Sequence, residues 1–74
     1  MNPAQLTKMV NDIAEFFVGE SGADQAVADV ASHMRRYWDP RMRREIVAYY
    51  AQGGDGLSDV SRKAVAQLAL AAHQ

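Results

Sequence analysis

The fold of this chain is decided by one stretch near its middle, His33-Met34-Arg35-Arg36-Tyr37-Trp38-Asp39-Pro40-Arg41-Met42-Arg43-Arg44. Within it, Asp39 comes directly before Pro40, and a residue before proline is pushed out of the helical region of backbone space. Asp39 is also a good helix N-cap, and proline suits the first position of a helix. The stretch therefore predicts a sharp corner, at which one helix ends and the next begins.

Helical patterns of apolar residues lie on both sides of this corner, and no run alternates as a strand would. We expect one helix from residues 21–24 to about 38, and another from 40 to about 52. Of the aromatic residues at the corner, Trp38 should be mostly buried and Tyr37 half-buried. The inward faces of these helices are predicted to contain Ala23, Val27, Val30, Ala31, Met34, Tyr37 and Trp38, and then Met42, Ile46, Tyr49 and Tyr50, with Val47 at the margin.

Two further helices are expected near the ends of the chain. The first should follow the N-cap Asn2, with Pro3 at its first position, and end at Gly19. Its apolar stripe is predicted to contain Leu6, Met9, Val10, Ile13, Phe16 and Phe17. The last helix should be capped by Ser58, and its tail, residues 71–74, should fray. Its inward face is predicted to contain Val60, Ala64, Val65, Leu68 and Ala71.

The segment Gly53-Gly54-Asp55-Gly56 separates the last two of these helices. It resembles a phosphate-binding loop only superficially, because it follows a helix and lacks the Lys-Ser/Thr pair of that motif. In addition, Asp55 would repel phosphate. We therefore expect the end of a helix followed by a turn.

Length and composition favour a single all-α domain over residues 1–74, a small compact bundle of about four short helices. The chain has no cysteine, which excludes disulfides, thiolate metal sites and cysteine nucleophiles. No apolar run approaches the roughly 20 residues that span a bilayer, and no signal-peptide pattern opens the chain. The expected location is the cytoplasm.

The net charge of −1 hides an uneven distribution. Residues 1–34 carry −4, residues 35–44 carry +4, and the remainder carries −1. Such a dipolar surface favours oriented docking on a charged partner over general adhesion to polyanions.

The corner is accordingly predicted to be a docking surface. Arg35 and Arg36 lie in the last turn of a helix, where the helix dipole favours cations by roughly 0.3–1 kcal/mol each. Arg41, Arg43 and Arg44 lie in the opening turns of the next helix, where positive charge opposes the dipole, so local stability does not explain them. The candidate partner-binding residues are His33, Arg35, Arg36, Tyr37, Trp38, Asp39, Pro40, Arg41, Arg43 and Arg44.

Two alternatives stay open at this point. The arginines could form a solvated face with internal ion pairs, for example between Arg41 and Glu45 four residues on. The chain could also be a stand-alone nucleic-acid-binding helical domain that uses the cluster from Arg35 to Arg44, since arginine forks bind phosphate well. The pI of about 6.0 argues against the second alternative. Protein is the better-supported partner, because Trp, Tyr and Arg dominate interface energies.

The sequence does not point to catalysis. His33 can reach Asp29 and Tyr37 on its own helix, which is typical of a helix-surface hydrogen bond, and His73 lies in the tail. The two histidines, forty residues apart, have no metal-ligand spacing. We predict no catalytic, cofactor-binding or metal-binding residue.

The stretch from His33 to Arg44, followed by Gly53-Gly54-Asp55-Gly56-Leu57-Ser58, resembles the delta subunit of the soluble NAD-dependent formate dehydrogenases. The resemblance extends to Leu6-Thr7-Lys8-Met9-Val10-Asn11 and to Phe16-Phe17. Phenylalanine is usual in that family where this chain has Tyr37, a change that keeps the ring and adds a hydroxyl.

The resemblance implies a small non-catalytic subunit of an oxidoreductase complex that converts formate and NAD to carbon dioxide and NADH. It implies an alpha subunit with a molybdenum or tungsten bis-pterin guanine dinucleotide centre and iron–sulfur clusters. Beta and gamma subunits would hold FMN, further clusters and the NAD site. The delta subunit would support assembly or stability of the complex. Together with the charged corner, this predicts that the chain docks on the alpha subunit through residues 33–44, its arginines meeting carboxylates or, less favoured, cofactor phosphates.

Overall fold

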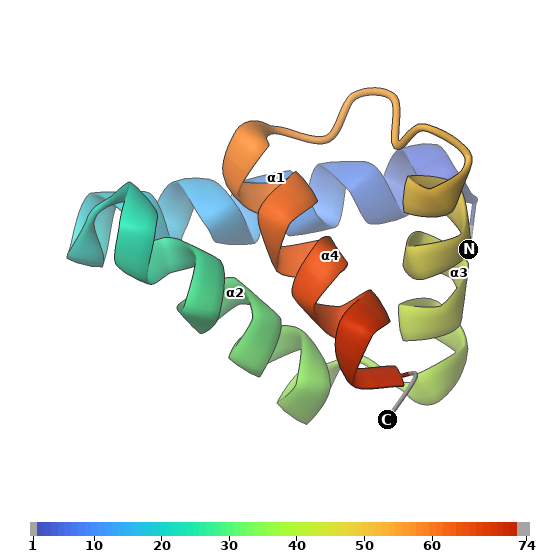
Figure 1. Ribbon diagram of the computed structural model, residues 1–74. Helices are drawn as coiled ribbons and strands as arrows, with labels where there is room; N and C mark the ends of the chain where they lie inside the picture. The colour runs from blue at the N-terminus through green and yellow to red at the C-terminus, as the bar shows by residue number, and fades with distance from the viewer. Residues whose placement is uncertain (1, 73–74) are drawn as a thin grey trace.

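The computed structural model describes residues 2–72, which form four helices and no strand (Figure 1). The helices are α1 (Pro3–Ser21), α2 (Ala23–Tyr37), α3 (Pro40–Ala51) and α4 (Asp59–Ala72). The predicted all-α bundle of about four short helices is confirmed. The sequence predicts fraying for residues 71–74. Helix α4 includes residues 71 and 72, whereas His73 and Gln74 lie outside the described residues.

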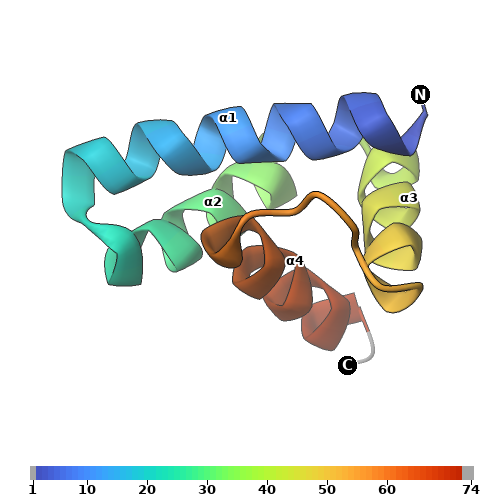
Figure 2. The same ribbon diagram turned by 90° about the horizontal axis from the view of Figure 1, so that it is seen from above.

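The four helices close around one apolar core. In Figure 1, α4 lies between α2 and α3, and in Figure 2 the long helix α1 runs across the other three. Every helix contributes to the core, and the loop before α4 adds one leucine. The buried cluster contains Leu6, Val10, Ala14, Val30, Ala31, Met34, Trp38, Ile46, Leu57, Ala64, Val65 and Leu68.

Helix α1 begins where the sequence predicts but ends later. The side chain of Asn2 accepts a hydrogen bond from the backbone N–H of Gln5 (2.9 Å), which confirms the N-cap. The predicted end at Gly19 is wrong, because the helix continues to Ser21 and stops at Gly22, whose φ is 84°. A glycine inside a helix lowers its stability by about 1 kcal/mol without breaking it, whereas a positive φ does end it.

The inward faces are largely as predicted, with corrections at their margins. Trp38 is 4% exposed, as expected, but Tyr37 is 72% exposed and not half-buried. The chain leaves the helical conformation at Trp38, which turns the indole into the core and leaves Tyr37 outside. Phe16, at the margin of the α1 stripe, is 61% exposed. Ala23 and Ala71 are exposed, since they lie near helix ends that no neighbour covers.

The glycine-rich segment ends α3 and turns toward α4, as predicted. The backbone N–H groups of Gly53 and Gly54 donate to the carbonyls of Tyr50 and Tyr49 (3.0 Å each). Gly54 has a φ of 60°, a conformation that residues with a side chain rarely adopt. The hydroxyl of Ser58 then accepts from the N–H of Ser61 (3.2 Å), which confirms the cap of α4.

Three side chains from different helices hold this loop in place. Asn11 of α1 donates to the carbonyl of Gly56 (2.9 Å) and accepts from the N–H of Ser58 (3.0 Å). Tyr49 donates to the carbonyl of Asp55 (2.6 Å). Arg62 of α4 donates to the carbonyls of Gly53 and Gly54 (2.8 and 2.9 Å). The loop is therefore a fixed part of the fold.

Candidate docking surface

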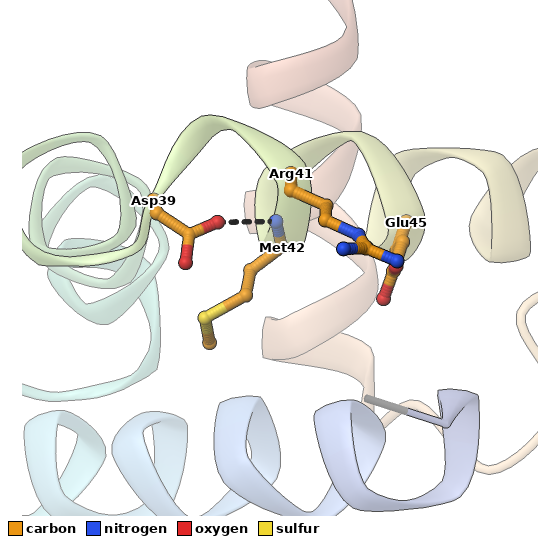
Figure 3. A network of polar contacts seen from close by, with 4 residues as sticks. All are labelled: Asp39, Arg41, Met42 and Glu45. Atoms are coloured by element: carbon orange, nitrogen blue, oxygen red, sulfur yellow. Dashed lines mark hydrogen bonds and ion pairs between the residues drawn. The ribbon is translucent and has the colours of Figure 1, made fainter.

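The corner between α2 and α3 is a two-residue connection with both helix ends capped. Trp38 is the C-cap of α2, and its N–H donates to the carbonyl of Met34 (3.1 Å). The carboxylate of Asp39 accepts from the N–H of Met42 (2.8 Å; Figure 3). Pro40 is the first residue of α3. The predicted sharp corner is confirmed, and it fixes the relative directions of the arginines on its two arms.

Arg43 points inward and serves the corner itself. The side chain is partly buried, and its guanidinium donates to three carbonyls at the end of α2, those of Met34 (3.5 Å), Arg35 (3.3 Å) and Trp38. The last carbonyls of a helix carry its partial negative charge, although that of Met34 also accepts from the N–H of Trp38. The favourable interaction of a cation with the end of α2 therefore explains why Arg43 points inward. That Arg43 also contacts a partner stays a prediction.

Arg41 is exposed and engaged on its own helix. Its Nε lies 3.3 Å from a carboxylate oxygen of Glu45, the pair that the sequence suggests (Figure 3). The side chain of Arg41 is 81% exposed. Exposed ion pairs contribute roughly 0–1 kcal/mol, so a partner carboxylate could replace Glu45 at little cost.

The remaining three arginines of the corner, Arg35, Arg36 and Arg44, are exposed. Within residues 2–72 none of the three forms an ion pair or a side-chain hydrogen bond. Three guanidinium groups of one sign thus stand around a rigid corner with their charge uncompensated.

An aromatic edge borders the corner on the α1 side. The ring of His33 packs against Tyr37 (centroids 4.9 Å apart) and against Phe17 of α1 (6.2 Å), and Phe17 meets Phe16 edge-to-face (5.2 Å). A shallow hollow of about 300 Å³ lies beside these rings, with Asp12 at its rim. Tyr37 and Phe16 present their rings to solvent.

His33 contacts Tyr37, as expected, but does not bond to Asp29. Asp29 accepts a hydrogen bond from Gln25 (3.1 Å) and none from His33. The Nδ1 atom of His33 is buried and has no hydrogen-bond partner within residues 2–72. The histidine therefore packs as a ring within the aromatic edge.

The predicted site residues lie together at one corner, but some of them stabilise the fold and others face solvent. Trp38 is a core residue, and Asp39 is a helix cap. The sequence predicts both Phe16 and Phe17 on the inward stripe of α1. Phe17 does pack against the core, whereas Phe16 is exposed, and both rings belong to the aromatic edge. Two adjacent residues of a helix point about 100° apart, so the pair could have indicated that one ring lies outside.

The family model for the NADH-dependent formate dehydrogenase delta subunit FdsD matches residues 5–65. The chain belongs to this family. Members are delta subunits of formate dehydrogenase, so the chain is a component of a multisubunit oxidoreductase. The matched residues include both arms of the corner and the loop that Asn11 holds. No curated protein and no solved structure matches the chain.

Nowhere in residues 2–72 do three or more histidine, aspartate or glutamate side chains gather as they would around a metal ion. Over the same residues, no helix has both the length and the apolar character needed to cross a membrane.

Proposed function

We propose that the chain is a non-catalytic delta subunit that docks through its corner on the catalytic alpha subunit of a formate dehydrogenase and thereby supports assembly or stability of the complex. The observation that carries this proposal is the set of exposed arginines, Arg35, Arg36 and Arg44, without a carboxylate partner in the described chain. The family assignment indicates that the complex is a formate dehydrogenase.

The rigidity of the corner supports a docking role. Side chains on a fixed corner lose little backbone entropy when a partner binds, so more of the contact energy remains as affinity. Arg43 contributes to this rigidity by its hydrogen bond to the carbonyl of Trp38. The exposed Arg35, Arg36 and Arg44 contribute positive charge. Tyr37 adds an exposed ring of the kind that dominates interface energies.

The partner would meet the corner with carboxylates and an apolar surface. The molybdenum or tungsten pterin centre, iron–sulfur clusters, FMN and NAD would belong to the alpha, beta and gamma subunits. Association in the cytoplasm fits a chain without cysteine, because the reducing compartment disfavours disulfides.

Affinity purification of the tagged chain from its host tests the proposal, with mass spectrometry of the proteins recovered in fixed ratio. We expect a large molybdoenzyme subunit and its NAD-reducing partners. Cells that lack the chain should yield less assembled complex. Recovery of the chain without any formate dehydrogenase subunit would contradict the proposal.

Nucleic acid recovered with the chain would favour the other reading of the arginines. Binding to random duplex DNA should then weaken steeply as salt rises, because each phosphate contact releases a counterion. The docking proposal expects no such binding at low salt.

A further inference from the structure

An apolar groove lies between α3 and α4, next to the corner. It has a volume of about 740 Å³. Its floor and walls are apolar, formed by Val47, Ala48 and Ala51 of α3 and by Leu68 and Ala71 of α4. Three of these five side chains are single methyl groups, too small to fill the space between the two helices. The groove exists because Ala48, Ala51 and Ala71 leave this space unfilled.

Arginines stand at the end of this groove nearest the corner. Arg35 of α2 and Arg44 of α3 both border it. Both are exposed and form no ion pair within residues 2–72. Arg43 also borders the groove, but its guanidinium is held by the carbonyls of α2. The groove therefore offers an apolar floor beside two positive charges that lack a counter-charge.

We infer that this groove takes an acidic amphipathic helix of the catalytic subunit, whose apolar stripe enters between α3 and α4 and whose carboxylates pair with Arg35 and Arg44. The inference rests on the proposed function for the identity of the partner. Charge complementarity carries the choice of an acidic segment, because a basic or neutral segment would leave both arginines without a counter-charge.

A helix fits the groove better than an extended strand. The described residues contain no strand, so no sheet edge exists to which a partner strand could add. The residues of α3 that line the groove span positions 40–51, which corresponds to roughly 16 Å of helix at 1.5 Å per residue. About three turns of a partner helix match that length, and alanines in the wall let two helix backbones approach closely.

A small anionic ligand fits the same groove less well. Sites for such ligands place several polar groups around the bound molecule to fix its orientation. Here the polar groups stand only at one end, and the remainder of the lining is aliphatic. A second copy of this chain is the other conceivable occupant, since residues 1–34 carry a net charge of −4.

Filling the groove tests whether it is occupied. Ala48→Leu puts an isobutyl group into it, and Ala28→Leu is the matched control, because Ala28 is an exposed alanine of α2 that does not border the groove. Leucine is a good helix former, so neither change should lower the melting temperature. In titrations of the purified catalytic subunit, Ala48→Leu should weaken binding by about tenfold and Ala28→Leu by less than about twofold.

A cross-link identifies the occupant. The chain has no cysteine, so Ala51→Cys introduces a unique thiol to which a benzophenone maleimide can be attached. Irradiation of the complex should join position 51 to a helical segment of the catalytic subunit in which carboxylates flank apolar residues. A cross-link to a second copy of the chain, or to no protein, would overturn the inference.

Docking through the corner and occupation of the groove can be tested separately. Wild-type affinity of Ala48→Leu, with the wild-type chain still bound, would overturn the groove and leave docking through the corner in place. If the wild-type chain did not bind the catalytic subunit, the proposed function would fail, and the groove inference with it.

Discussion

The guanidinium of Arg43 donates a hydrogen bond to the carbonyl of Trp38, five residues back along the chain. Because Trp38 is the C-cap of α2 and its indole is buried, this bond ties the first turns of α3 to the end of α2 and to the core. The arginine-rich stretch thus has two parts. Arg43 holds the corner from inside, whereas Arg35, Arg36 and Arg44 face outward.

Replacing Arg43 should therefore destabilise the fold, although most surface arginines can be lost at little cost. We expect Arg43→Ala to lower the free energy of unfolding by about 2 kcal/mol, since hydrogen bonds from a charged donor contribute roughly 1.5–3 kcal/mol. Arg44→Ala is the matched control, and it should change stability by no more than about 0.5 kcal/mol. Urea denaturation followed by circular dichroism measures both, and equal stability of the two variants would contradict the inward role of Arg43.

The two glycines Gly54 and Gly19 should respond in opposite directions to alanine. At Gly54 the φ is 60°, and an added Cβ would lie 2.9 Å from the side chain of Leu57 and 3.3 Å from the Cα of Tyr50. Gly54→Ala should destabilise the chain by more than about 1 kcal/mol. Gly19 is helical with no atom within 4 Å of an added Cβ, so Gly19→Ala should stabilise by about 0.4–1 kcal/mol. Thermal melts of the two variants should shift to opposite sides of the wild type.

Asn11 is expected to matter more than its half-buried position suggests. Its amide makes two hydrogen bonds with the loop before α4, to Gly56 and from Ser58. Asn11→Ala should cost about 1–2 kcal/mol, because both loop groups lose their partner. Asp12→Ala, which removes only the exposed pair with Lys8 (2.8 Å), should cost less than about 0.5 kcal/mol. A hydrogen-exchange experiment should show faster exchange of the Ser58 amide in Asn11→Ala alone.

Tyr37 provides a test of the aromatic edge. Its ring is 72% exposed, so Tyr37→Ser should leave stability within about 0.5 kcal/mol of the wild type. Binding to the catalytic subunit should weaken by about tenfold, since exposed aromatic anchors often carry interface energy. Tyr37→Phe keeps the ring and should bind as the wild type does. Equal binding by Tyr37→Ser would exclude this edge from the interface.

Local patterns account for the parts of the fold that the sequence could predict. Proline after Asp39 placed the corner, and cap residues placed the starts of α1 and α4, because each signal acts within a few residues. The end of α1 was missed, since a glycine at position 19 is compatible with a helix and only the backbone of Gly22 turns away.

Contacts between distant residues could not be predicted in this way. Asn11 and Ser58 are 47 positions apart, and only the packing of α1 beside the loop brings them together. The inward turn of Arg43 likewise depends on where α2 ends relative to α3. A sequence pattern shows that charges are dense, whereas the structure shows which of them the fold itself uses.

The central claim is that the outward arginines of the corner bind the catalytic subunit. The most direct test is isothermal titration of that purified subunit with the wild-type chain and with the Arg35→Ala/Arg36→Ala/Arg44→Ala variant, which retains Arg43. We expect the variant to keep its helix content, with a melting temperature only slightly lower because Arg35 and Arg36 interact favourably with the dipole of α2. Its affinity should fall by about a hundredfold, since arginine is among the residue types that carry most of the binding energy of an interface. Lys63→Ala, which removes an exposed charge from α4, should bind normally. Wild-type affinity of the folded triple variant would contradict the account.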